Sequence, residues 1–334
     1  MLKATFEDFR CKYCGSKSIV KYGVFQGMQY WWCKSCKHKF ADNDALPEMK
    51  TPLNQVASAL SMFYEGMSLN AIRRHLNQTH NNLPSKSSVY DWITRFTKIA
   101  VAKSEGYRPK VGSVWIADET VLKIGGKNVW FWDIIDAKTR FLLASRISRT
   151  RTTEDARRLM YEAATRAGKS PRVVLTDQLA AYLDGIELAF GADTKHIQSK
   201  PFTIENSTNL IERFHGTLKG RTKVMRGLKQ IETANLFTDG YLVFYNFLRP
   251  HESLEDRTPA EAAEVSFPYK NWLDIVKSES MPVYDPSRHI PIGQTLHGYV
   301  GVSQKQPVKK QVIRRRRLSR TRANSMPTIS SIRI

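Results

Sequence analysis

Apolar residues recur at every third or fourth position between residues 53 and 103, which is the spacing of amphipathic helices. The helices that this spacing predicts cover residues 53–64, 68–76 and 87–100. Ser68 stands just before the second apolar series, at the position of a helix N-cap. Three short helices with tight connections and basic residues among them favour a helix-turn-helix DNA-binding domain over residues 53–103. An ordinary small helical bundle is the alternative.

From residue 111 the pattern changes to short apolar runs that alternate with helical periodicity. We expect strands at residues 114–118, 121–124, 129–135, 140–147, 171–176 and 194–198, and helices at residues 153–167, 178–190, 209–228 and 233–248. The Gly125-Gly126 pair predicts the turn of a hairpin. Three antiparallel strands followed by alternating helices and strands predict an α/β fold, in which a mixed sheet is flanked by helices.

Charge narrows the class of partner. The chain of 334 residues has 52 Lys and Arg against 31 Asp and Glu, a formal net charge of +21. Such an excess favours a polyanion, nucleic acid first and a membrane surface second. No apolar run approaches the roughly 20 residues of a spanning helix, and the first residues lack the apolar region of a signal peptide. We therefore expect no membrane association and a cytoplasmic, nucleoid-associated protein.

A basic block lies near the C-terminus. Residues 305–322 contain nine basic residues and no acid, including Arg314, Arg315, Arg316 and Arg317. A block of like charges is typical of chain that is disordered when free, so we predict a basic, partly disordered tail over residues 270–334. Contact with a nucleic-acid backbone would give this tail a role, and a solvated tail without a role is the alternative.

All four cysteines lie in two close pairs, Cys11-x2-Cys14 and Cys33-x2-Cys36, separated by eighteen residues. This is the spacing at which two pairs of thiolates close a tetrahedral Zn²⁺ site. Four thiolates leave no open position, so the zinc would be structural. Residues 18–22 and 29–32 are expected to form strands, which predicts a zinc ribbon over residues 1–45. Disulfides are the alternative.

Three acids come from separate predicted elements. Asp118 is predicted to end the first strand of the mixed sheet, Asp177 ends another strand, and Glu212 lies in a helix. Strand alternation puts Asp118 on one face and Glu119 on the other. Carboxylates that converge need a cation, and oxygen-only ligands suit Mg²⁺ or Mn²⁺. Each acid also has an ordinary alternative as a strand end, a helix cap or a surface ion pair.

The helix that carries Glu212 has a second relevant feature. Charged residues recur every seven positions and share nearly one face of this helix: Glu212, Lys219 and Arg226. On this face an acid that can bind a metal ion is followed by basic residues that can bind phosphate. The predicted buried stripe is formed by Ile211, Phe214, Leu218 and Met225. Glu205 is a rival for the position of the third acid. His215 and His251 are possible neighbours of the site.

These motifs resemble DDE transposases of bacterial and archaeal insertion sequences. The resemblance rests on WIADET around Asp118, VLTD ending at Asp177 and NLIERFHGTLKGRTKVMRG around Glu212. Thirty-four residues separate Asp177 from Glu212, a spacing common in several such families, and Lys219 matches the basic residue that follows the catalytic Glu there. YNFLRPHESLEDRTPAEAA, residues 245–263, is similar to the segment that closes many integrase-type cores. The resemblance covers roughly residues 10–265.

The resemblance implies an RNase H-like catalytic domain over residues 111–265, in which Asp118, Asp177 and Glu212 hold two Mg²⁺ or Mn²⁺ ions. It implies a transposase that cuts and joins DNA, with transposon ends and target DNA as partners. Since two ends must be brought together, at least a homodimer is expected. A DNA-binding regulator derived from a transposase and a metal-dependent nuclease without joining activity remain the alternatives.

Overall fold

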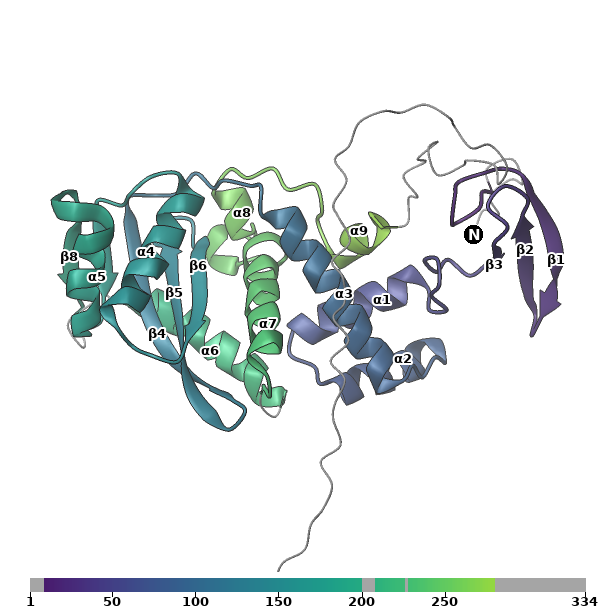
Figure 1. Ribbon diagram of the computed structural model, residues 1–334, viewed down its shortest axis with the longest axis horizontal. Helices are drawn as coiled ribbons and strands as arrows, with labels where there is room; N and C mark the ends of the chain where they lie inside the picture. Colours follow the sequence, from purple (N-terminus) through teal and green to yellow (C-terminus); the bar gives the residue numbers. More distant parts are fainter. Residues whose placement is uncertain (1–8, 200–207, 226–227, 280–334) are drawn as a thin grey trace, which may run out of the picture. The chain divides into compact units, whose positions relative to one another are not determined.

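The computed structural model describes residues 9–199, 208–225 and 228–279, all of which belong to one compact unit, residues 1–285 (Figure 1). Its first part is a three-stranded antiparallel sheet in the order β1-β2-β3, formed by β1 (Ile19–Phe25), β2 (Met28–Cys33) and β3 (Lys39–Ala41). The first two strands confirm the prediction, and β3 was not predicted because it has only three residues. Cys11 and Cys14 precede β1, Cys33 ends β2 and Cys36 lies between β2 and β3, which is consistent with a zinc ribbon.

Three helices follow, as the apolar periodicity predicts. They are α1 (Leu53–Tyr64), α2 (Leu69–His80) and α3 (Lys86–Ser104). Ser68 is the N-cap of α2, and its hydroxyl accepts a hydrogen bond from the backbone N–H of Ala71 at 3.2 Å. The predicted apolar face is buried, including Ile72 and Leu76 of α2. These three helices, called the helical domain below, precede the mixed sheet within the same compact unit.

The mixed five-stranded sheet has the order β6-β5-β4-β7-β8 and confirms the predicted α/β class. Its strands are β4 (Val114–Ile124), β5 (Lys127–Asp136), β6 (Leu142–Ser148), β7 (Val173–Thr176) and β8 (Lys195–Gln198). The first three are antiparallel, whereas β7 lies parallel to β4 and β8 parallel to β7. The predicted strand end at Asp118 is wrong, because β4 continues through Asp118 and Glu119, which pair with Asp133 and Trp132 of β5.

Helices cover both faces of this sheet. They are α4 (Thr153–Ala167), α5 (Ala180–Phe190), α6 (Asn209–Val224) and α7 (Ile231–Val243) (Figure 1). The Trp132 ring packs against Tyr182 of α5 at 5.6 Å between centroids, while the neighbouring Phe131 ring packs against Phe214 of α6 at 6.4 Å. Because successive residues of a strand point to opposite faces, α5 and α6 lie on opposite sides of the sheet.

Short helical turns complete the described chain. They are a 3-10 turn (Gly191–Asp193), a π-helical turn that continues α7 (Phe244–Leu248), a 3-10 turn (Glu252–Leu254), α8 (Pro259–Ala262) and α9 (Trp272–Lys277). In α9 the Trp272 ring stacks on Tyr64 of α1 at 4.9 Å. The segment predicted as a tail, residues 270–334, thus begins with a packed helix. Arg314, Arg315, Arg316 and Arg317 lie outside the described residues.

Within the described ranges, no helix combines the length and the apolar character that crossing a membrane requires.

The predicted helix over residues 209–228 ends at Val224 instead, and the one over residues 233–248 begins at Ile231. Both shifts are small, and neither alters which elements surround the sheet.

The close approach of α7 to the helical domain depends on Gly240. Tyr64 Oη of α1 is 2.7 Å from Thr97 Oγ1 of α3, and both groups lie over Gly240, where an added Cβ would collide with Tyr64 Oη and Thr97 Cγ2. All of these residues are buried. Since packed interiors accommodate extra atoms poorly, only glycine fits this position without moving its neighbours.

We therefore expect Gly240→Ala to destabilise the protein by about 1–3 kcal/mol, the usual cost of overpacking a core. Gly216→Ala is the matched control, because this helical glycine of α6 has open space around it and alanine there should stabilise by up to about 1 kcal/mol. Urea unfolding of the full chain measures both. Equal stabilities of the two variants would contradict the packing argument.

Candidate functional site

Three carboxylates meet at an open edge of the mixed sheet. β7 pairs with β4 only along Val114–Ile116 of β4, so Asp118 and Glu119 extend beyond the end of β7. Asp177 follows the last residue of β7 directly. One carboxylate oxygen from each of Asp118, Glu119 and Asp177 lies within 4.8 Å of the other two. The structure therefore brings together two of the three predicted acids and adds Glu119.

Glu119 has its own partners on the α5 side of the sheet. Its side chain is 1% exposed and forms an ion pair with Arg151, whose Nη2 is also 3.8 Å from Asp177 Oδ2. Burial raises the pKa of Glu119, while Tyr182 and Arg151 oppose this shift. Arg151 therefore neutralises part of the negative charge at the open edge. The sequence prediction did not include Arg151, because it lies in an irregular segment without a periodic signal.

On the opposite face, His215 of α6 lies between two carboxylates. Its Nε2 is 2.6 Å from Oδ1 of the fully buried Asp133, and its Nδ1 is 3.4 Å from Asp118 Oδ2. Burial lowers the pKa of His215, but Asp133 and Asp118 outweigh this effect and raise it to about 10. Burial raises the pKa of Asp133 to about 6, against the effect of His215. A positively charged His215 thus joins α6 to the sheet beside Asp118.

Glu212 lies in the first turn of α6, three residues before His215, so the two side chains are neighbours on the helix surface. Its carboxylate is exposed and accepts a hydrogen bond from Thr208 Oγ1 at 2.9 Å. It is not one of the three acids that lie within 4.8 Å of one another. Glu212 as the third metal ligand therefore stays a prediction. The rival Glu205 lies outside the described residues.

The other predicted residues of α6 divide between the surface and the core. Lys219 is exposed, and Arg226 lies outside the described residues. The predicted buried stripe is confirmed at Ile211, Phe214 and Leu218, and Met225 is half-buried. His251 packs edge-on against Tyr245 at 4.6 Å between ring centroids, and burial lowers its pKa to about 4. The His251 ring contacts Tyr245, whereas the His215 ring contacts Asp118 directly.

The donor set at the open edge fits divalent cations such as Mg²⁺ or Mn²⁺, which prefer carboxylate oxygens. Asp118 and Asp177 are both partly exposed, so their oxygens are accessible from solvent. Glu119 is buried against Arg151 and Tyr182. This difference in burial makes Asp118 and Asp177 the better candidates for metal ligands and Glu119 a supporting group.

The four cysteines form the second candidate metal site. Cys11 Sγ lies 3.6 Å from Cys36 Sγ, and Cys14 Sγ lies 3.6 Å from Cys33 Sγ. Four thiolates around Zn²⁺ at about 2.3 Å lie about 3.8 Å apart, so the arrangement fits a tetrahedral zinc site. All four are free thiols, which argues against the disulfide alternative. Gly15, with φ of 69°, makes the turn after the first pair.

The pKa shifts of the thiols differ in sign, and burial raises the pKa of Cys11 and, to about 11, the pKa of Cys36. Burial opposes ionisation of Cys33, but the backbone N–H groups of Cys36 and Ser35 and the neighbouring thiols outweigh this and lower its pKa to about 7. His38 lies beside the site, where its Nδ1 is 2.9 Å from the Cys36 carbonyl oxygen and its ring stacks on Tyr13. His38 is therefore held by other contacts and is not needed as a ligand.

We expect the purified chain to hold one equivalent of zinc, and Cys33→Ala to lose it together with the fold of the ribbon, because metal binding worth about 10 kcal/mol is the folding energy of so small a module. Elemental analysis measures the metal, and limited proteolysis measures the loss of structure. His38→Ala, the matched control, should keep the full equivalent. Full zinc content in Cys33→Ala would contradict the assignment.

The contact between His215 and Asp133 is testable through stability. His215→Ala leaves the Asp133 carboxylate buried without its cation, which should cost about 3–5 kcal/mol. Asp133→Asn in the same chain removes the unpaired charge and should recover part of this loss. A double-mutant cycle by urea unfolding measures the coupling. Additive effects of the two substitutions would show that the pair is not coupled.

The central part of the chain matches a known family. Residues 112–251 match the family model described as a DDE domain. No curated protein matches the sequence. Several solved structures of retroviral integrases match this chain with low TM-scores.

The magnesium complex of the HTLV-2 integrase catalytic core domain, trimeric form, is 18% identical, with a TM-score of 0.36 over 48% of this chain and 99% of that one. The catalytic core domain of BIV integrase is 17% identical, with a TM-score of 0.35 over 46% of this chain and 94% of that one. A simian T-cell lymphotropic virus intasome, in complex with PP2A regulatory subunit B56 gamma, is 14% identical, with a TM-score of 0.34 over 75% of this chain and 80% of that one.

These structural likenesses are weak, and the assignment rests on the DDE-domain match. That match includes the WIADET and VLTD motifs and the helix that carries Glu212. Residues 112–251 of this chain therefore form a DDE domain.

Proposed function

We propose that this protein is a DNA transposase that cleaves DNA at the ends of an insertion sequence and transfers the strands to a target. The observation that carries the proposal is the group formed by Asp118, Glu119 and Asp177 at the open edge of a DDE domain. Acids from β4 and from the end of β7, with a third on α6, supply the oxygen ligands that phosphoryl transfer on DNA requires.

In this proposal Asp118 and Asp177, with Glu212 of α6, would hold the divalent ions. When bound, two such ions activate the attacking oxygen and stabilise the leaving oxygen of a phosphodiester. The protein's own side chains hold the ligands in place. His215 fixes Asp118 from one face of the sheet, and Arg151 contacts Asp177 and Glu119 from the other.

Charge and composition support DNA as the partner. Lys219 follows Glu212 by two turns of α6, about 10 Å along the helix, where it can contact a phosphate next to the metal site. Arg226 and the basic residues 314–317 would extend this contact. The proposed domains are a zinc ribbon over residues 1–45, a helix-turn-helix domain over residues 53–103, the catalytic domain over residues 111–265 and a basic tail over residues 270–334.

Recognition of the ends would fall to the ribbon and the helical domain, and catalysis to the DDE domain. Because two ends must be cut and joined in one complex, we propose a homo-oligomer of at least two chains on DNA. The proposed site of action is the cytoplasm, in association with the nucleoid.

We expect Asp118→Asn to reduce Mg²⁺-dependent strand transfer by at least about 100-fold while end binding is retained, because the substitution removes a charged metal ligand but no DNA contact. Labelled element ends and a target plasmid provide the assay, and a chelator should reproduce the loss in the wild type. Asp184→Asn, on the exposed side of α5, is the matched control and should keep full activity.

The same assay separates the alternatives. Unchanged transfer in Asp118→Asn would overturn the proposal. Cleavage without a joined product in the wild type would indicate a nuclease, and end binding with neither product would indicate a regulator. Glu212→Gln should also abolish transfer, whereas Glu119→Gln should retain part of it. The reverse order would make Glu119 the third ligand.

A further inference from the structure

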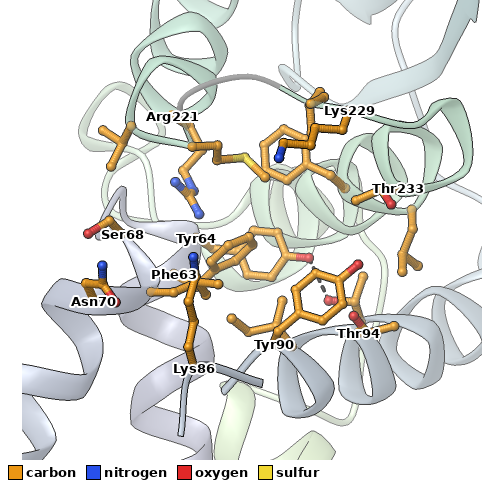
Figure 2. A pocket seen from close by; sticks show the side chains of 18 of the residues that line it. Phe63, Tyr64, Ser68, Asn70, Lys86, Tyr90, Thr94, Arg221, Lys229 and Thr233 are labelled. Atoms are coloured by element: carbon orange, nitrogen blue, oxygen red, sulfur yellow. Dashed lines mark hydrogen bonds between the residues drawn. The ribbon is translucent and has the colours of Figure 1, made fainter. Parts of the chain in front are cut away.

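A cavity of about 690 Å³ lies apart from the carboxylates, between the helical domain and helices α6 and α7 (Figure 2). Its walls come from α1, α2, α3, the end of α6, the described residues Met225 and 228–230, and α7. The proposed transposase chemistry assigns no role to this cavity. Its volume is within the usual range for sites that bind small molecules.

Arg221 of α6 points into this cavity (Figure 2), and no described residue that lines the cavity is an anionic partner for it. The residue is 3% exposed, and its guanidinium carbon lies 3.9 Å from the centre of the Phe63 ring. Within the described part of the chain, none of its three nitrogens has a hydrogen-bond partner. Burial lowers the pKa of Arg221 to about 10, with only the hydroxyls of Tyr64 and Tyr241 acting against this. Five buried N–H donors without acceptors are costly unless a ligand satisfies them.

The other charged groups of the cavity have the same sign. Arg74, Lys86 and Lys229 line it together with Arg221, and no Asp or Glu is found among the described residues that line it. The first three are exposed at the rim, so only Arg221 is fully desolvated. Four cations facing one space favour an anion, and the planar guanidinium matches the paired oxygens of a phosphate.

The remaining wall is aromatic and apolar. Tyr90 is 44% exposed, and its ring faces the cavity from α3, opposite Arg221 (Figure 2). Phe63 and Phe237 form the floor beneath the guanidinium. A bare phosphate would leave this aromatic wall unused, whereas a nucleotide offers a phosphate for Arg221 and a flat ring for Tyr90.

We propose that this cavity binds a phosphate-bearing nucleotide, with the phosphate on Arg221, Lys86 and Lys229 and the base against Tyr90. The nucleotide is either free or an unpaired residue of a DNA strand. The site uses none of the carboxylates at the open sheet edge, so it stands whether or not the proposed transposase function holds.

Isothermal titration calorimetry of the full chain, without added divalent ions, tests the proposal with five probes: 5′-dTMP, thymidine, inorganic phosphate, a single-stranded thymidine pentanucleotide and a blunt duplex of twelve base pairs. We expect 5′-dTMP or the pentanucleotide to bind at least about tenfold more tightly than thymidine and phosphate. Only these two probes have both a phosphate for the cationic side chains and a base for the Tyr90 ring. The duplex measures binding to the phosphate backbone in general.

Substitutions of cavity residues test whether the nucleotide binds in this cavity. Arg221→Met, Tyr90→Ala and the double variant Lys86→Ala/Lys229→Ala should each weaken nucleotide binding about tenfold or more. Lys98→Ala/Lys195→Ala removes the same charge from exposed positions outside the cavity and should leave binding unchanged. Arg221→Met should keep or raise the melting temperature, since it removes an unpaired buried charge. A purely structural Arg221 would instead lower it.

Tight binding of the pentanucleotide identifies a DNA strand as the source, and tight binding of 5′-dTMP alone identifies a free nucleotide. Absence of binding by both, equal affinity for phosphate, or wild-type affinity in the cavity variants would overturn the proposal. If Arg221→Met does not fold, Tyr90→Ala and the lysine pair decide. Asp118→Asn should bind the nucleotide normally, so failure of the cavity and failure of the catalytic proposal are told apart.

Discussion

The contact of His215 with Asp118 and Asp133 is the interaction on which the geometry of the site depends. The two carboxylates come from paired positions of β4 and β5, and the imidazole comes from α6 on the same face of the sheet. Removing charges from water is unfavourable, so this arrangement is stable only while the cation and the carboxylates are held together. The contact thereby holds the first turns of α6, which carry Glu212, against the sheet.

The short length of β7 is the second constraint. A parallel strand of four residues leaves the central part of β4 without a partner on one side. Asp118 and Glu119 point to opposite faces of the sheet, yet their carboxylates meet at this open edge, where Asp177 also lies. Arg151 and His215 then approach from the two faces and offset the repulsion among three acids. A longer β7 would fill the edge and remove the space for a metal ion.

The sequence predicted the elements more completely than their connections. Apolar periodicity predicted the helices around Ile72 and Phe214, and cysteine spacing predicted the cluster of four thiols. The continuity of β4 was missed, because the polar residues at 118–120 resemble a strand end, and pairing with β5 sustains the strand there. Asp133 carried a usable signal, since an acid inside the apolar run VWFWDIID needs a buried partner. That partner, His215, lies 82 residues away in the sequence, so only the fold reveals it.

Helix α6 carries two buried cations, His215 and Arg221, and their partners differ in a way that folding alone does not explain. His215 has two carboxylates as partners, whereas Arg221, six residues later, packs on Phe63 and Phe237 and pairs with no acid among the residues that the structure describes. An apolar side chain of similar length would fill the same space and avoid the cost of desolvating a guanidinium. If stability were the only requirement, leucine or methionine would serve better at position 221. The arginine is therefore best understood as a group that receives its counter-charge from outside the chain.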